Sequence, residues 1–256
     1  MIKTVKMAKT ETNRKTDRLK NIKTVILDFD NTLEIWCAYA EKVTETKWIK
    51  TVCNNENLPI SKFSKIYKDI KAKMLWKEIH YNTDAYSRGL WLSLVLEKLD
   101  KKMSASKIKS YNNLYWKISL DYISLYSGAE ETLKYLREKG YGLIMLTDSD
   151  GDKKYKNWRL NRLKIKKYFN SIITTDDTKA NKPSPKNYEY LINNTGIIPK
   201  ETAVIGDSPK KDLSGAKKFG ITTILVKQGM SRNVDISKYK YIDYALSHIK
   251  DVPKLL

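Results

Sequence analysis

The chain after residue 128 alternates between short apolar runs and segments with helical apolar spacing, and this alternation constrains the fold most strongly. An earlier β-branched run that ends in acids, TVILDFD, has the pattern of a buried parallel strand. Strands that alternate with helices imply a parallel sheet with right-handed crossovers. Strands are expected at Thr24–Asp30, Tyr141–Thr147, Ser171–Thr175, Thr202–Gly206, Ile221–Val226 and near Tyr241–Ala245, and helices at Ala129–Lys139, Asp152–Leu163, Pro185–Asn194, Lys210–Phe219 and from Ser247.

Residues 35–125 interrupt this alternation between the first and second strands. Their apolar residues have helical spacing with three breaks, which predicts four helices and no strand. Four tryptophans fall in these helices, and packing explains them better than a stacking platform: Trp48, Trp76, Trp91 and Trp116. The predicted fold is therefore α/β, with a Rossmann-like parallel sheet core (21–34 and 126–256) and an inserted all-helical cap.

The chain is strongly basic, with 49 Lys and Arg against 29 Asp and Glu and a formal charge of +20. Such a balance can attract nucleic acid, phosphorylated metabolites or anionic membranes. The lysines are spread along the chain, so general lysine enrichment is favoured over a nucleic-acid-binding block. Residues 1–20 are interpreted as a loose basic arm, for which nucleic acid is a less favoured partner.

Cysteine content and hydropathy indicate a cytoplasmic protein. The two cysteines, Cys37 and Cys53, form no disulfide framework and match no zinc spacing, so inert reduced thiols are expected. No run approaches the roughly 18 apolar residues that cross a bilayer, so no membrane partner is expected. The sequence is compatible with a monomer or a homodimer.

Polar clusters stand at or just after the predicted strand ends, where open α/β sheets bind ligands. The first is Asp28-Phe29-Asp30-Asn31-Thr32, whose two acids can face one cleft. Magnesium prefers oxygen ligands, and a metal-bound carboxylate stays ionised and can attack phosphorus. A second carboxyl group can protonate the leaving oxygen and then activate water. The alternative to a catalytic role is an ordinary acidic turn after a strand.

Three further clusters follow in order along the chain. Thr147-Asp148-Ser149 could hold phosphate oxygens, although taken alone it is better explained as an ordinary helix N-cap. Lys182 precedes a helix and could neutralise a phosphoryl group. Asp207 stands where a second metal carboxylate is needed, and Asp212 could orient it. Each cluster is weak alone, but their order and placement give a joint signal.

On these four clusters the chain resembles the haloacid dehalogenase-like hydrolase superfamily, over about residues 24–250. The resemblance is greatest to the phosphatase branch with a helical cap between the first two motifs. It implies that Asp28 is the nucleophile and a magnesium ligand. It implies that Asp30 is the general acid and base, with its main-chain carbonyl on the metal. Asp207 would complete the metal site, supported by Asp212.

The resemblance also assigns the phosphate-binding groups. Thr147 and the Asp148 amide would bind phosphoryl oxygens, and Lys182 would be the lysine of the third motif. Asp148 stands where many relatives have asparagine. The carboxylates of residues 28, 30 and 207 are expected to converge around one Mg²⁺.

The expected activity is Mg²⁺-dependent hydrolysis of a small phosphorylated metabolite through an aspartyl-phosphate. A phosphomutase, and a nucleic-acid-associated phosphatase or phosphate-binding protein that uses the basic surface, are the alternatives. Dehalogenases of the superfamily lack the second acid, so Asp30 favours phosphate chemistry. Tyr86, Arg88 and Lys117 could approach the cleft from the cap, but a solvated helix face explains them equally well.

Overall fold

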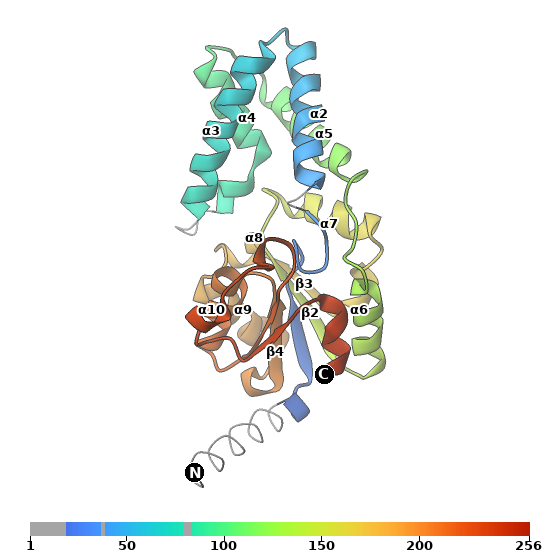
Figure 1. Cartoon of the computed structure of the whole chain (residues 1–256). Helices are drawn as coiled ribbons and strands as arrows, with labels where there is room; N and C mark the ends of the chain where they lie inside the picture. The colour runs from blue at the N-terminus through green and yellow to red at the C-terminus, as the bar shows by residue number, and fades with distance from the viewer. Residues whose placement is uncertain (1–18, 37–38, 79–82) are drawn as a thin grey trace.

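The structure, a computed structural model, describes residues 19–36, 39–78 and 83–256. Six parallel strands form one sheet in the order β3-β2-β1-β4-β5-β6 (Figure 1). The strands are β1 (Thr24–Leu27), β2 (Gly142–Thr147), β3 (Ser171–Thr174), β4 (Thr202–Gly206), β5 (Thr222–Val226) and β6 (Tyr244–Leu246). The α/β fold with a parallel sheet is confirmed.

The strand order reverses direction at β1, which lies between β2 and β4. Leu27 pairs with Met145 on one side and with Ile205 on the other. A crevice opens beyond the carboxyl ends of the strands at such a switch point, and ligands of open α/β sheets bind there. The first predicted motif directly follows β1, so the fold places it at this position.

Helices cover both faces of the sheet, and the period of two in β1 sorts its side chains between them. Val25 and Leu27 pack with α6 (Ala129–Glu138) and the C-terminal 3₁₀ helix (Ile249–Lys254). Ile26 points to the other face. There it packs with side chains of α9 (Pro185–Thr195) and the segment that carries α10 (Ser214–Lys217). α7 (Lys153–Arg162) follows β2, and the short α8 (Thr175–Thr178) follows β3.

A separate group of helices stands beyond the carboxyl ends of the strands, at the top of Figure 1. We call it the helical insertion: α2 (Ala40–Asn55), α3 (Ile60–Glu78), α4 (Arg88–Lys98) and α5 (Ala105–Ser119). It has its own apolar cluster. Trp48, Trp91 and Trp116 are buried in that cluster, as expected, while the side chain of Trp76 lies outside the described part. The exact domain boundaries stay a prediction.

Two predicted elements differ from the structure near the C-terminus. The helix expected at Lys210–Phe219 is divided into a π-helical turn, Pro209–Leu213, and the short α10. The last strand begins at Tyr244 rather than near Tyr241. The reason is local: Thr223 Oγ1 donates to the Tyr241 carbonyl (2.5 Å), which holds that segment in a turn.

The structure describes only some of the residues that concern the predicted inert thiols and the predicted basic arm. Cys53 is buried and free, and burial raises the pKa of its thiol to about 11. Cys37 and residues 1–18 lie outside the described ranges. Among the helices that the structure describes, none is both long and apolar enough to cross a bilayer.

Candidate active site

Three buried carboxylates meet at the switch point. Asp28 follows β1, Asp207 follows β4, and Asp212 lies in the π-helical turn. Each offers an oxygen atom, and these atoms lie within 4.8 Å of one another. The exposed fractions of the three residues are 5%, 7% and 2%. The fold therefore brings Asp28 beside two acids from a distant part of the sequence.

Short polar contacts and one glycine hold this carboxylate triplet together. Thr32 Oγ1 donates to Asp28 Oδ2 (2.8 Å) and accepts a hydrogen bond from the Asp207 backbone N–H (3.0 Å). A Cβ atom on Gly206 would lie 2.4 Å from the Cβ of Asp212. Only glycine leaves room for that carboxylate beside the end of β4.

One buried cation, Lys182, contacts the triplet. Its Nζ lies 2.5 Å from Asp28 Oδ1 and 2.7 Å from Asp212 Oδ1. Burial and the neighbouring Asp212 carboxylate raise the pKa of Asp28 to about 7, against the pull of Lys182. The same two causes raise the pKa of Asp207 well above its usual value. Three clustered oxygen donors with uncompensated charge fit a hard divalent cation.

The triplet opens into a cavity of about 360 Å³ between the sheet edge and the helical insertion. Several of its wall residues come from the helical insertion or the segments beside it: Trp36, Glu41, Leu75, Tyr86, Arg88 and Trp116. Of the three residues that could approach the cleft from the cap, Tyr86 and Arg88 line the cavity. Lys117 is exposed and is absent from the cavity wall.

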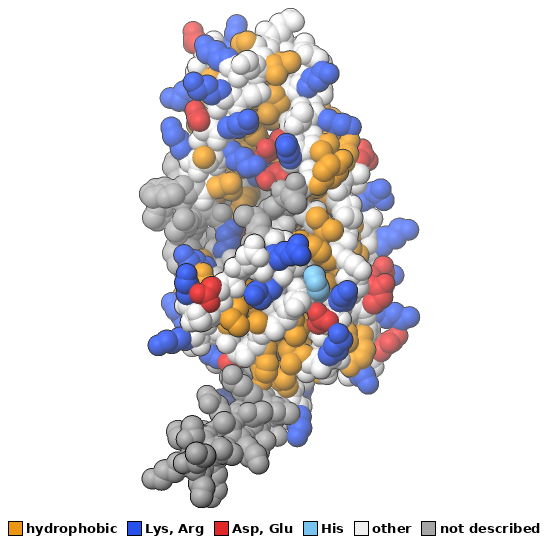
Figure 2. Space-filling model, viewed as in Figure 1, with side chains coloured by type: hydrophobic (Ala, Val, Ile, Leu, Met, Phe, Trp, Pro, Cys, Tyr) orange, Lys and Arg blue, Asp and Glu red, His pale blue; other side chains and the backbone are white. Residues whose placement is uncertain are grey.

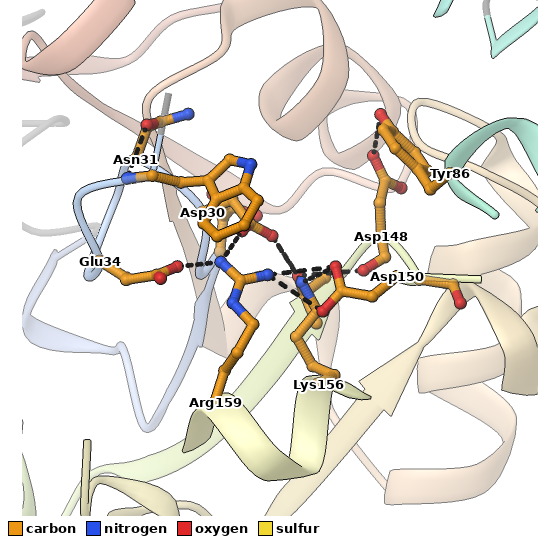
Figure 3. A network of polar contacts seen from close by, with 12 residues as sticks. Asp30, Asn31, Glu34, Tyr86, Asp148, Asp150, Lys156 and Arg159 are labelled. Carbon is orange, nitrogen blue, oxygen red and sulfur yellow. Dashed lines mark hydrogen bonds and ion pairs between the residues drawn. The ribbon is translucent and has the colours of Figure 1, made fainter. Parts of the chain in front are cut away.

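Asp30 lies apart from the triplet, although one residue separates it from Asp28. Its carboxylate points toward α7 (Figure 3). There Lys156 Nζ donates to Asp30 Oδ2 (2.6 Å), and the Arg159 guanidinium hydrogen-bonds Oδ1. Of the three carboxylates expected to converge, those of Asp28 and Asp207 are in the triplet and that of Asp30 is not. The Asp30 main-chain carbonyl as a metal ligand stays a prediction.

Asp30 belongs instead to a buried ionic network that the sequence did not reveal (Figure 3). Arg159 Nη1 lies 3.1 and 3.0 Å from the two oxygens of Asp150, and Arg159 Nη2 donates to Glu34. Lys156 Nζ lies 3.0 Å from Asp150 Oδ1. Arg159 and Lys156 are each 1% exposed, and Glu34 is fully buried. Three acids here share two cations.

The network sets the ionisation of its acids. Burial opposes ionisation of Asp30, but Arg159 and Lys156 hold its pKa well below the usual range. Burial raises the pKa of Glu34 to about 8 in spite of Arg159. A basic residue at i and i+3 on α7 is ordinary in a chain with 49 Lys and Arg. The sequence therefore offered no usable signal for this network.

The second predicted cluster, Thr147-Asp148-Ser149, lines the cavity only in part: Asp148 and Ser149 are in the wall. Thr147 is fully buried, and its Oγ1 donates to Asp30 Oδ2 (3.3 Å). Asp148 lines the cavity, and its Oδ1 accepts from the Lys182 backbone N–H (3.1 Å). Its Oδ2 lies 3.5 Å from the Tyr86 hydroxyl and 3.6 Å from Lys211 Nζ. Asp148 thus contacts both Lys182 on the core side of the cavity and Tyr86, which precedes α4.

Known proteins resemble this chain over most of its length. The family model described as haloacid dehalogenase-like hydrolase matches residues 25–226. The glyceraldehyde 3-phosphate phosphatase of Pyrococcus furiosus is 26% identical over 238 residues, which cover 93% of each protein. The (S)-2-haloacid dehalogenase 4A of Burkholderia cepacia is 30% identical over 128 residues, 50% of this chain and 54% of that protein.

A solved structure has the same fold. The HAD-hydrolase YfnB from Bacillus subtilis, solved bound to magnesium, aligns with a TM-score of 0.68 at 17% identity. The alignment covers 92% of this chain and 98% of that one. The likeness extends across the sheet and the helical insertion together, since it spans nearly the whole chain.

Replacing Arg159 with methionine should strongly destabilise the chain. The substitution leaves Glu34 and Asp150 buried beside Lys156 alone, and breaking a buried ion pair from one side costs about 3–5 kcal/mol. Urea unfolding of Arg159→Met measures this loss. Arg162→Met, an exposed change on the same helix, should cost about 1 kcal/mol or less. Equal stability of the two variants would contradict the role given to Arg159.

The raised pKa of Asp28 should make the cation-free protein less stable at higher pH. Between its ordinary value of 3.8 and about 7, the folded state holds a proton that the unfolded state has released. The free energy of unfolding therefore falls as pH rises through this window. We expect a lower Tm in EDTA at about pH 8 than at about pH 5.

Two controls isolate this contribution by calorimetry. Asp28→Asn removes the titrating group and should reduce the difference in Tm between the two pH values. Mg²⁺ should raise Tm more at the higher pH, where the carboxylates are ionised. An unchanged pH dependence in Asp28→Asn would assign the effect to other groups.

Proposed function

The chain belongs to the haloacid dehalogenase-like hydrolase family, and we propose that it is a magnesium-dependent phosphatase of small phosphomonoesters. The observation that carries this proposal is the buried carboxylate triplet with Lys182 at the base of the cavity. The name of the Pyrococcus furiosus relative, similar over 93% of each protein, supports phosphate chemistry. The helical insertion would act as a cap that shields the cavity from water.

The triplet suits a magnesium site because its oxygen donors are clustered, buried and short of positive charge. Asp28, Asp207 and Asp212 would hold the ion. When bound, it would supply positive charge to the phosphoryl oxygens. Lys182 would add a second positive charge beside Asp28, so the nucleophile and an incoming phosphate do not repel each other.

The proposed first step is attack by Asp28 on phosphorus. An oxygen of its carboxylate forms the new bond, and the bond from phosphorus to the leaving oxygen breaks. The product is an aspartyl-phosphate, which water then hydrolyses to release inorganic phosphate. Thr147 and the Asp148 amide would bind phosphoryl oxygens. The protein's contribution is mostly positioning and charge neutralisation.

Asp30 would move the protons in both steps, and its contacts favour one of them. An ionised carboxylate can accept a proton from the attacking water, and Lys156 and Arg159 hold Asp30 ionised. Donation to the leaving oxygen requires the protonated form, which the same two cations oppose. Proton donation by Asp30 therefore requires that the bound substrate weaken its contacts with Lys156 and Arg159.

Loss of the Asp28 carboxylate should abolish turnover. In Asp28→Asn we expect kcat/KM for p-nitrophenyl phosphate to fall by about 10³-fold or more, because the amide is a poor nucleophile. The wild type should need Mg²⁺ and lose activity in EDTA. Asp235→Asn, an isosteric change on an exposed loop, is the matched control and should keep activity. Full activity of Asp28→Asn would refute the mechanism.

The same assay separates the alternative activities. A phosphomutase would return the phosphoryl group to an organic acceptor, so inorganic phosphate would not accumulate. A dehalogenase would release halide from a 2-haloacid without Mg²⁺. A nucleic-acid-dependent role would need a binding surface. On the face in Figure 2, however, Lys and Arg side chains are scattered among other types rather than gathered in one block.

A further inference from the structure

The helical insertion contributes a charged pair to the cavity wall, and the phosphoryl chemistry proposed above does not use it. The pair is Glu41, from the first turn of α2, and Arg88, the first residue of α4. Arg88 Nη2 lies 3.4 Å from Glu41 Oε1. The Arg88 guanidinium also lies 4.1 Å from the ring centroid of Trp91 and is 3% exposed. Packing therefore fixes Arg88 in place.

Two further charged residues, Lys71 and Glu45, extend this pair into a larger ionic group. Lys71 Nζ lies 3.0 Å from Glu41 Oε2 and 2.7 Å from Glu45 Oε1. Two acids and two bases thus form one neutral group on the helical insertion. Only Glu41 and Arg88 of the four line the cavity. A ligand there meets a hydrogen-bond acceptor beside a donor, with no net positive charge.

The rest of the cavity wall is acidic. Carboxylates outnumber cations among the lining residues by seven to three, counting Glu41 and Arg88 themselves. Three of these carboxylates, Asp30, Asp150 and Glu41, also pair with cations outside the wall, namely Lys156, Arg159 and Lys71. A Mg²⁺ ion would reduce the remaining negative charge, and a bound phosphate would add negative charge again. A second anionic group on the substrate would be repelled by Glu41 without finding a free cation at Arg88.

We propose that Glu41 and Arg88 select phosphomonoesters whose leaving group is uncharged and hydroxylated, such as a polyol or a small sugar. The inference rests on the proposed phosphatase function and specifies its substrate class. A substrate hydroxyl would donate to the Glu41 carboxylate and accept from Arg88. Trp36, Trp116 and Leu75 supply apolar surface for the carbon chain. The volume of about 360 Å³ suits a small substrate.

Two substrates of one carbon skeleton test this selection. Glycerol 3-phosphate and 3-phosphoglycerate differ at one end, which is a hydroxymethyl group in the first and a carboxylate in the second. We expect the wild type to prefer glycerol 3-phosphate by about tenfold or more in kcat/KM, because a site built for a hydroxyl rejects a charged analogue. Preference for 3-phosphoglycerate, or equal rates, would overturn the proposal.

A pair of matched variants tests the role of Glu41. Glu41→Gln keeps the shape, removes the negative charge and leaves Arg88 without its acidic partner in the cavity wall. We expect it to shift the ratio of the two kcat/KM values about tenfold toward 3-phosphoglycerate. Glu45 also pairs with Lys71, but it does not line the cavity. Glu45→Gln should therefore leave the ratio unchanged. Equal shifts in both variants would overturn the proposal.

Hydrolysis of p-nitrophenyl phosphate separates the two possible failures. If the wild type hydrolyses neither p-nitrophenyl phosphate nor either member of the glycerol pair with Mg²⁺, the proposed phosphatase function is wrong. If it does, but shows no preference within the glycerol pair, only the assignment of Glu41 and Arg88 is wrong. The wild-type comparison needs no variant, so it decides the matter even if Glu41→Gln fails to fold.

Discussion

The clustering of three buried carboxylates around a single lysine is the interaction on which the site depends. Burial and mutual repulsion raise the pKa values of Asp28 and Asp207, and Lys182 offsets only part of this increase. The surrounding fold holds the acids in place nevertheless: β1 and β4 are hydrogen-bonded neighbours, and Gly206 leaves room for Asp212. Such an arrangement is costly for a protein that only needs stability, and it suits one that binds a cation.

A second ionic network lies beside the first and has a different balance. Asp28 and Asp30 are next-nearest neighbours in sequence, yet the turn after β1 sends their carboxylates to different groups of partners. The first group has three acids for one cation, whereas the second has three acids for two. The two acids of the first motif therefore have opposite pKa shifts. The turn after β1 therefore places the two acids in different ionic surroundings, one short of positive charge and the other close to two cations.

The sheet edge and the helical insertion contribute different groups to the cavity wall. The sheet edge supplies the acids and the lysine of the cavity wall, and the helical insertion supplies Trp116 and the Glu41–Arg88 pair. Tyr86 joins the two parts, because its hydroxyl accepts from Lys211 Nζ (2.7 Å) and lies near Asp148.

The sequence alone determined the elements with clear periodicity and the positions of the acids along the chain. A parallel strand must end where its apolar run ends, so the pattern of residues is enough to place Asp28, Thr147 and Asp207 at one edge of the sheet. Local pattern could not place the π-helical turn at Pro209–Leu213, which depends on how that segment packs beside β4.

Only the tertiary structure decided which charges pair. Arg159, Lys156, Glu41 and Arg88 are ordinary members of a chain with 49 basic and 29 acidic residues, and no spacing distinguishes them. Their pairing depends on helices from separate segments that are brought within a few ångströms, which is a property of packing. Electrostatic energy depends on distance and burial, and neither quantity is written in the order of residues.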